Sequence, residues 1–394
     1  MKRIVLLIAA AAIAVHAAAF EFGLNMTNSH ELSGEDKTLS LLDNHRLSGF
    51  LKTPMGSNGS LYLSADVGAY TLFRFLPKAD PIWQPFSEIL KIKRTDWSGT
   101  VAFNRIGIEW ALGRTNFNDY SNKILRGLFD GGRIKFTINH TNLAFAVGYT
   151  GLTHKSDAKI RIDADDTTRL ASADELLAPK RVFLSASSYF QDSIPSHTFG
   201  VDLLAQFDIS ALTRRTHTQY VIPYIYGRIT SNLSWKYWAA VELGQDPAFF
   251  YSLASGASLT YFNPNWRFFT LTGMADWAAG DYDGSGRMRA FIPLTDAKHT
   301  RIANVRYRNM LTAGLTASVL PIQGLKTELS YLAVLNPNTL KQPIYTGSEI
   351  FGKILHQLNN DVDASLTSGV FIANKKAMGY TIRWLAELSC TMHL

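Results

Sequence analysis

Residues 310–372, MLTAGLTASVLPIQGLKTELSYLAVLNPNTLKQPIYTGSEIFGKILHQLNNDVDASLTSGVFI, decide the fold because they repeat one pattern four times between brief turns. In residues 311–319 every second side chain is apolar, and small polar residues and glycine fill the places between. A two-residue period predicts a β-strand with two unlike faces. The same alternation returns after Gly324, after Gly347 and after Asn360.

The polar face of these predicted strands carries charge. It includes Lys326, Glu328, Glu349, Lys353 and Asp363, whereas the opposite face is almost entirely aliphatic and aromatic. A soluble β-sandwich would close its apolar faces over one another. A membrane barrel would turn them to lipid and its charges to a watery lumen. Alternation alone does not choose between these two folds.

The start of the chain favours the membrane barrel. Lys2 and Arg3 precede an apolar run over residues 4–15, and Ala17–Ala19 supplies the small residues that a signal peptidase accepts. Residues 1–19 are therefore predicted to be a cleavable signal peptide, and residues 20–394 a single domain. Beyond residue 20 no apolar run is long enough to span a bilayer as a helix. A membrane location would then require a closed barrel.

Charge and cysteine content exclude two other classes. The formal net charge is +7, and without Lys2 and Arg3 it is +5. That value is too mild to indicate nucleic acid as a partner, and no basic run supports it. The one cysteine, Cys390, has no second cysteine with which to form an intrachain disulfide, so no disulfide framework is expected.

The length of the connections supports an outer-membrane barrel. We expect eighteen strands, near residues 20–28, 44–54, 60–76, 87–103, 105–114, 131–139, 142–152, 180–190, 196–208, 218–229, 231–245, 249–262, 265–279, 308–319, 324–336, 346–357, 361–373 and 377–391. Brief turns follow the even-numbered strands. Long connections follow most odd-numbered ones, at 29–43, 77–86, 115–130, 153–179, 209–217, 280–307 and 337–345. Barrels in the outer membrane of diderm bacteria have short periplasmic turns and long extracellular loops.

Three groups of residues resemble alginate-export-type outer-membrane barrels. Gly113-Arg114 through Phe117, Asp119 and residues 129–131 is similar to the "GR…FDG" stretch of that family. Gly280-Asp281 followed by residues 291–294 resembles its "GD…F-x-x-L/F-P" loop, with the proline one place early. Residues 347–350 resemble its "G-x-E-L" strand opening. The resemblance implies an eighteen-stranded, porin-like barrel with a charged lumen that passes an anionic polysaccharide or another small solute.

Strand parity predicts which charged side chains line the pore. They are of both signs: Arg105, Glu109, Arg133, Lys135, Lys236, Glu242, Lys326, Glu328, Glu349, Lys353 and Arg383. Opposite charges on neighbouring strands can pair, so one interpretation of this set is purely structural. The alternative places Arg105, Arg133 and Lys135 at a constriction, because they flank the connection 115–130, which could fold into the pore. A basic constriction predicts a weak preference for anions.

Arg114 is ranked beside these constriction residues because it matches the family's arginine. Its parity is wrong for the lumen unless a bulge intervenes.

One loop has the spacing of a metal site. Asp281, Asp283 and Ser285 alternate with other residues, and glycines allow a sharp turn within residues 281–286. This resembles the opening of a calcium loop, although no later bidentate acid stands at the expected spacing. Asp-Gly and Ser-Gly are also ordinary turn sequences. Apart from this calcium candidate, no cofactor is expected.

Two functions remain open from the sequence. The first is a channel for small hydrophilic or anionic solutes, or for a polysaccharide, because about eighteen strands enclose a lumen too wide for inward side chains to fill. The second is a non-conducting surface barrel that acts as an adhesin or receptor through its extracellular loops. No catalytic motif is recognised, so no enzyme activity is expected. The expected partners are the lipid bilayer, the solute and the outer-membrane assembly machinery.

Overall fold

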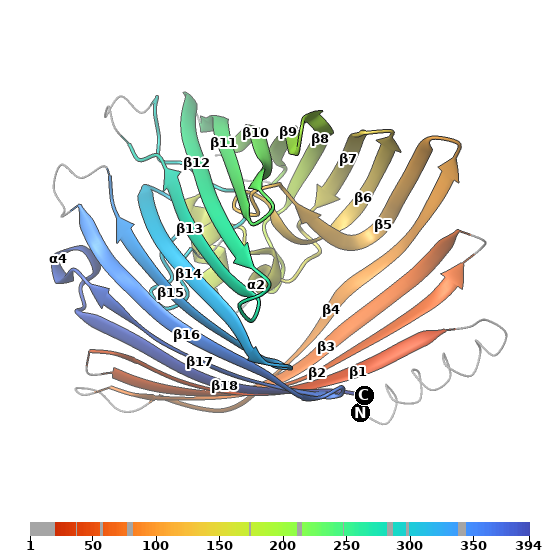
Figure 1. The fold of residues 1–394 in the computed structure, drawn as a ribbon. Coiled ribbons are helices and arrows are strands. Elements are labelled where there is room, and N and C mark those ends of the chain that lie inside the picture. Colours follow the sequence, from red (N-terminus) through yellow and green to blue (C-terminus); the bar gives the residue numbers. More distant parts are fainter. Residues whose placement is uncertain are drawn as a thin grey trace.

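The computed structural model is a single antiparallel sheet of eighteen strands that closes on itself (Figure 1). It describes residues 20–36, 38–55, 58–76, 82–172, 175–210, 215–246, 248–281, 287–296, 299–337 and 344–394. The strands are β1 (Glu21–Glu35), β2 (Thr38–Met55), β3 (Gly59–Phe75), β4 (Ile82–Phe103), β5 (Ile106–Asn118), β6 (Arg126–Ile138), β7 (Thr141–Tyr149), β8 (Arg181–Ile194), β9 (His197–Asp208), β10 (His217–Thr230), β11 (Leu233–Asp246), β12 (Ala248–Asn263), β13 (Phe269–Ala278), β14 (Met310–Ile322), β15 (Leu325–Leu335), β16 (Tyr345–Asn359), β17 (Val362–Ala373) and β18 (Ile382–His393). Short helices α2 (Lys155–Ala158), α3 (Ala164–Ala171) and α4 (Lys375–Met378) lie in the connections. The predicted fold class is confirmed.

The barrel closes where the first strand meets the last. β1 pairs with β18 from Asn25 opposite His393 to Glu35 opposite Arg383. Backbone groups of Leu24 and Leu394 continue this seam, with N···O distances of 3.0 and 2.7 Å. β1 also pairs with β2 along its whole length, so both of its edges are occupied. Closure leaves no sheet edge unpaired, as a bilayer requires.

One expected connection is wrong. The sequence predicts a long loop over residues 29–43, but β1 runs to Glu35 and β2 begins at Thr38. The alternation is interrupted here because Asn28-Ser29-His30-Glu31 and Asp43-Asn44-His45-Arg46 are polar on both parities. Where both parities are polar, the sequence does not show which side chains face lipid and which face the lumen.

Apart from the connection between β1 and β2, most of the predicted long connections lie at one rim of the barrel and the short turns at the other. The turns after even-numbered strands are short, for example Asn104-Arg105 between β4 and β5. The largest connections, residues 150–180 and 279–309, follow β7 and β13. Among the described residues, no helix is long and apolar enough to cross a membrane.

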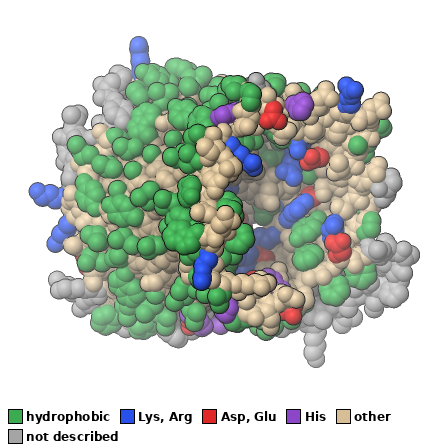
Figure 2. Space-filling view, in the orientation of Figure 1, with side chains coloured by type: hydrophobic (Ala, Val, Ile, Leu, Met, Phe, Trp, Pro, Cys, Tyr) green, Lys and Arg blue, Asp and Glu red, His purple; other side chains and the backbone are tan. Residues whose placement is uncertain are grey.

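The outer wall is apolar and the inner wall is polar. On β9, Phe199, Leu203 and Phe207 point outward and are 37–46% exposed, while Leu204 and Gln206 of the opposite parity are buried. Figure 2 shows hydrophobic side chains covering the wall, and basic and acidic side chains gathered in the hollow. The wall therefore suits acyl chains and the lumen suits water.

Long connections fold into the barrel and pack against its inner wall. A buried apolar cluster joins Phe129 and Phe183 of the wall to Ile124, Ile160 and Phe291 of three connections. Gly148 lies directly beside Phe183 across the β7–β8 pair. A Cβ at Gly148 would collide with the Phe183 ring, so glycine lets that ring lie flat against the wall.

A fully buried arginine anchors the connection 150–180. Arg181, at the start of β8, forms ion pairs with Asp163 and Asp166 at 3.0 and 2.9 Å, and lies 3.4 Å from Asp208 of β9. Asp163 is also the N-cap of α3 and forms a capping box with Asp166. The same carboxylates thus begin the helix and fasten it to the wall.

The lipid-facing assignment predicts an asymmetric effect of inserted charge. Leu203→Arg places a cation in the middle of the outer wall and is expected to lower the unfolding free energy by about 2–4 kcal/mol. The matched control, Ser187→Arg, adds the same charge to the inner wall, where Ser187 lines a cavity. Urea unfolding in lipid vesicles measures both. Equal losses in the two variants would contradict the assignment.

Candidate functional site in the lumen

The connection between β5 and β6, residues 119–125, is a compact loop built around one buried carboxylate. Asp119 accepts backbone N–H groups from Ser121 at 2.7 Å, Ile124 at 3.1 Å and Leu125 at 2.7 Å. It also accepts the hydroxyl of Ser121. Burial raises the pKa of Asp119, and these hydrogen bonds oppose that rise. Charge-assisted bonds of this kind fix the loop's shape.

The loop folds into the lumen and is attached on both sides. The N–H of Tyr120 donates to Oδ2 of Asp202 on β9 at 2.7 Å. The Tyr120 ring stacks on Tyr224 of β10, with centroids 3.8 Å apart. On its other side, Ile124 O accepts the N–H of Thr295 at 2.9 Å. Burial raises the pKa of Tyr120 to about 12, so its phenol is neutral at physiological pH.

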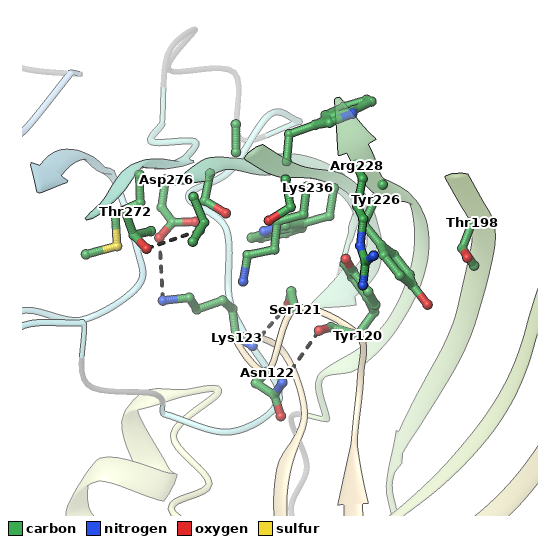
Figure 3. A pocket seen from close by; sticks show the side chains of 18 of the residues that line it. Tyr120, Ser121, Asn122, Lys123, Thr198, Tyr226, Arg228, Lys236, Thr272 and Asp276 are labelled. Atoms are coloured by element: carbon green, nitrogen blue, oxygen red, sulfur yellow. Dashed lines mark hydrogen bonds and ion pairs between the residues drawn. The ribbon is translucent and has the colours of Figure 1, made fainter. Parts of the chain in front are cut away.

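A cavity of about 810 Å³ lies between this loop and the wall formed by β9–β13 (Figure 3). Its charged side chains are Lys123, Asp192, Arg228, Lys236 and Asp276. Lys123 reaches across to Asp276 of β13, with Nζ 3.5 Å from Oδ2. Within the part of the chain that the structure describes, Arg228 and Lys236 take part in no ion pair. They are available to an anion.

A neutral histidine, His299, lies beside the ion pair between Lys123 and Asp276. Nδ1 of His299 lies 3.2 Å from Lys123 Nζ, and Nε2 lies 2.7 Å from Thr312 Oγ1. Burial, together with the smaller effect of the nearby Lys123 charge, lowers the pKa of His299 to about 3. The ring therefore accepts from Lys123 and donates to Thr312. His299 Nε2 also lies 3.5 Å from Asp276, but the ring is neutral, whereas Lys123 at 3.5 Å is a charged partner of that carboxylate.

A second cavity, of about 500 Å³, lies on the other side of the loop, against β4–β8. Its charged side chains are Arg94, Glu109, Arg133 and Lys135. Lys135 donates to Glu109 at 2.9 Å, and Arg133 donates to the carbonyl of Asn116 at 3.3 Å. Residues 120–123 line the first cavity, and residues 116–118 with Leu125 line the second, so the segment 116–125 lies between the two cavities.

A third cavity, of about 420 Å³, lies against β2–β4. Arg46, Lys91 and Lys93 face Asp66 of the wall and Asp157 of α2. Asp157 lies 3.3 Å from Lys91 and 3.2 Å from Lys93. Both lysines lower the pKa of this half-buried carboxyl more than its burial raises it. Helix α2 is thereby held to the basic wall.

Most charged residues predicted to line the pore lie on the inner face, but they have different surroundings. Glu109, Arg133, Lys135 and Lys236 border the cavities. At the two rims, Lys326 lies 4.0 Å from Glu328 and Arg383 lies 3.8 Å from Glu35. Lys353 lies directly opposite Glu328 in the β15–β16 pair.

Two predicted pore carboxylates are covered by the connection 279–309. Glu242 is fully buried and accepts the N–H of Ile292 at 2.9 Å. Glu349 accepts the N–H groups of Arg301 and Ile302 at 3.0 and 2.8 Å. These carboxylates anchor a loop rather than face open water.

Two predicted constriction residues lie elsewhere. Arg105 is in the exposed turn between β4 and β5, outside the wall. Arg114 lies on the outward parity, on the same face as Leu112, and forms a bidentate pair with Asp130 at 3.0 and 2.8 Å. The register of β5 against β4 and β6 is regular here, so no bulge turns Arg114 inward.

Several basic residues of the lumen were missed. Lys91 and Lys93 alternate with the exposed Leu90 and Ile92, so parity was sufficient to find them. Lys123 belongs to a connection, where no strand periodicity indicates which way a side chain points. Its role depends on how the loop folds.

The calcium candidate is only partly within the described residues. Asp283 and Ser285 lie outside them. Asp281 is described, and its Oδ1 accepts the N–H of Ala290 at 2.7 Å. The described ranges contain no group of three or more His, Cys, Asp or Glu side chains placed to hold a metal. Calcium binding at residues 281–286 stays a prediction.

Removing the Asp119 carboxylate is expected to release the loop. Asp119→Ala deletes all four hydrogen bonds that Asp119 accepts, each worth about 1.5–3 kcal/mol for a charged group. The segment should then leave the lumen, and single-channel conductance in planar bilayers should rise. Asn122→Ala, which changes an exposed side chain of the same loop, is the control. An unchanged conductance in Asp119→Ala would show that the loop does not limit the pore.

Acid is expected to loosen the His299 contact. Because the folded structure lowers the pKa of His299 from about 6.5 to about 3, the stability of this contact falls as the pH drops below about 6.5. At pH 5 the loss is about 2 kcal/mol. Conductance should therefore rise between pH 7 and pH 5 in the unmodified chain. His299→Gln keeps a neutral hydrogen-bonding group and should reduce that rise. Identical pH profiles would exclude this residue as the cause.

Solved structures share this architecture, while sequence comparisons find no relative. No family model matches the chain, and no curated protein matches it. Pseudomonas aeruginosa OccK7 (OpdD) has a TM-score of 0.63 at 11% identity, covering 95% of this chain and 98% of that one. OccK5 (OpdH) has a TM-score of 0.59 at 11% identity, with the same coverage. OccK2 (OpdF), solved in complex with glucuronate, has a TM-score of 0.57 at 12% identity, again covering 95% and 98%.

These structures support a porin-like barrel and leave the resemblance to alginate-export barrels as a prediction. Identities of 11–12% establish the fold alone. The chain thus has the fold of outer-membrane porins, a closed eighteen-stranded antiparallel barrel with an apolar outer wall and long connections folded into its lumen.

Proposed function

We propose that the chain is an outer-membrane channel for the passive diffusion of small anionic solutes, carboxylates in particular. The observation that carries the proposal is an excess of cations in each of the three cavities described above. The first holds three basic side chains against two acidic ones, the second three against one, and the third three against two. A partly desolvated basic lining concentrates anions and repels cations.

The first cavity has suitable groups for a hydroxylated carboxylate. The Arg228 guanidinium can bind a carboxylate through two parallel hydrogen bonds, and Lys236 adds a second positive charge. Hydroxyls of Thr198, Ser258 and Thr272 line the same space and can bond to solute hydroxyls. The glucuronate found with OccK2 belongs to this chemical class. We therefore propose sugar acids and similar small acids as the solutes.

The folded connections favour a channel over an adhesin. Residues 150–180 and 279–309, the segments available to bind a surface partner, contribute Ile160, Phe291 and Leu294 to the buried cluster inside the barrel. Loops used in this way shape the lumen. The same filling narrows the path available to a polysaccharide, so we favour small solutes. Export through the predicted signal peptide and insertion by the outer-membrane assembly machinery are parts of this proposal, and no catalytic step is included.

Neutralising the free cations should weaken anion preference. In a potassium chloride gradient across a planar bilayer, the reversal potential of the unmodified chain should favour chloride. Arg228→Gln with Lys236→Gln should shift it toward zero and weaken inhibition of ion current by glucuronate. Arg105→Gln removes the same kind of charge from the exposed turn and should leave both unchanged. A cation-selective reversal potential in the unmodified chain would overturn the proposal.

A further inference from the structure

Four polar side chains form a cluster on the outer wall, at the middle of β1 and β2. His30 Nδ1 lies 2.8 Å from Asp43 Oδ1, and His45 Nδ1 lies 2.9 Å from Asn28 Oδ1. The two imidazole rings are perpendicular, with centroids 6.3 Å apart. Asn28 pairs with His45, and His30 with Asp43, across the strands. We call these four residues the wall cluster.

The wall cluster lies inside the apolar band of the barrel. Along β1 it is flanked on the same parity by Met26 and Leu32, which are 40% and 37% exposed. Along β2 it is flanked by Leu41 and Leu47, at 39% and 45%. On β18, exposed Leu388 lies opposite His30. Lipid chains would therefore meet an acid and two histidines in the middle of the wall.

Lipid leaves half of the cluster's hydrogen-bonding capacity unused. Each imidazole uses one nitrogen, and the described residues give no partner to the other nitrogens, to Asp43 Oδ2 or to the Asn28 amide nitrogen. No Ser, Thr or Cys side chain of the described ranges bonds to either ring, so the geometry does not activate a nucleophile. Ionisable groups inside a membrane pair with one another or with a partner, since acyl chains cannot satisfy them.

We propose that the wall cluster is the contact surface for a second copy of this chain. Its four residues include both donors and acceptors, so two identical clusters can satisfy one another, as an isologous interface requires. Asp43 of one copy would accept from a histidine of the other. Ala69 of β3 lies directly opposite His45 on the same face, and a small residue there lets two walls approach closely.

The chain carries its own reporter of this contact. Cys390 of β18 is exposed and lies opposite Asn28 in the β1–β18 pair, on the same parity as Leu388. Two wall clusters in contact would bring the two Cys390 thiols within reach of a short bismaleimide. Because this is the only cysteine, the unmodified chain can be used.

The test is cross-linking of the purified chain in vesicles at low protein density, where copies of itself are its only protein neighbours. The unmodified chain should give a covalent dimer through Cys390. Leu203→Cys in a Cys390→Ser background moves the thiol to β9 on the opposite wall and should give several-fold less dimer. Equal dimer from both positions, or none from Cys390, would overturn the proposal and leave lipid as the occupant of this face.

A second variant separates the cluster from the rest of the wall. Replacing all four residues by leucine makes the wall uniformly apolar, which suits lipid and keeps the strands paired. Loss of the Cys390 dimer together with retained single-channel conductance would support the contact. Full retention of the dimer would show that the cluster does not form it. Conductance is independent of this outcome, so the channel proposal is tested separately.

Discussion

The pairing of β1 with β18 is the constraint on which the structure depends. In an apolar solvent every backbone donor and acceptor must be bonded within the protein, and a sheet achieves this only by closing. Once β1 pairs with β18, from the Leu24–Leu394 contact onward, each strand has two neighbours. The two faces then separate into different environments, and alternation along each strand decides which side chain meets lipid and which meets the lumen.

The connections that fold into the lumen are held there by one recurring type of hydrogen bond. Carboxylates on the inner wall accept backbone N–H groups of the connections that fold over them: Asp202 holds Tyr120, Glu242 holds Ile292, and Glu349 holds Arg301 and Ile302. Backbone groups buried inside a barrel need partners as much as those in a bilayer do. The contact of Asp202 with Tyr120 helps hold the loop 119–125 between two basic cavities. The shape of the path is therefore set by the connections, whereas its charge comes mainly from the wall.

The sequence predicted the wall better than its filling. In residues 310–372 the alternation is strong, and the four strands lie within a few residues of their predicted bounds. The prediction failed over residues 29–43, where β1 ends and β2 begins, because polar residues on the outer face interrupt the alternation. The parity of β5 predicted that Arg114 points outward, as it does in the structure. The family motif predicted a place in the lumen, and that prediction was wrong. Glu242 and Glu349 were correctly directed inward, but only the folded connections reveal that they are covered. Contacts of Lys123 depend on a loop conformation that no local pattern encodes.

Alternation requires only that residues on the outer face be apolar and residues on the inner face be polar. It does not require a particular amino acid at each position. That freedom accounts for the agreement in architecture with barrels that share only 9–12% of their residues with this chain. The connections inside are under different demands, because each must fit the particular cavity around it. Substitutions in the connections can therefore change the shape of the lumen while the surrounding barrel stays the same.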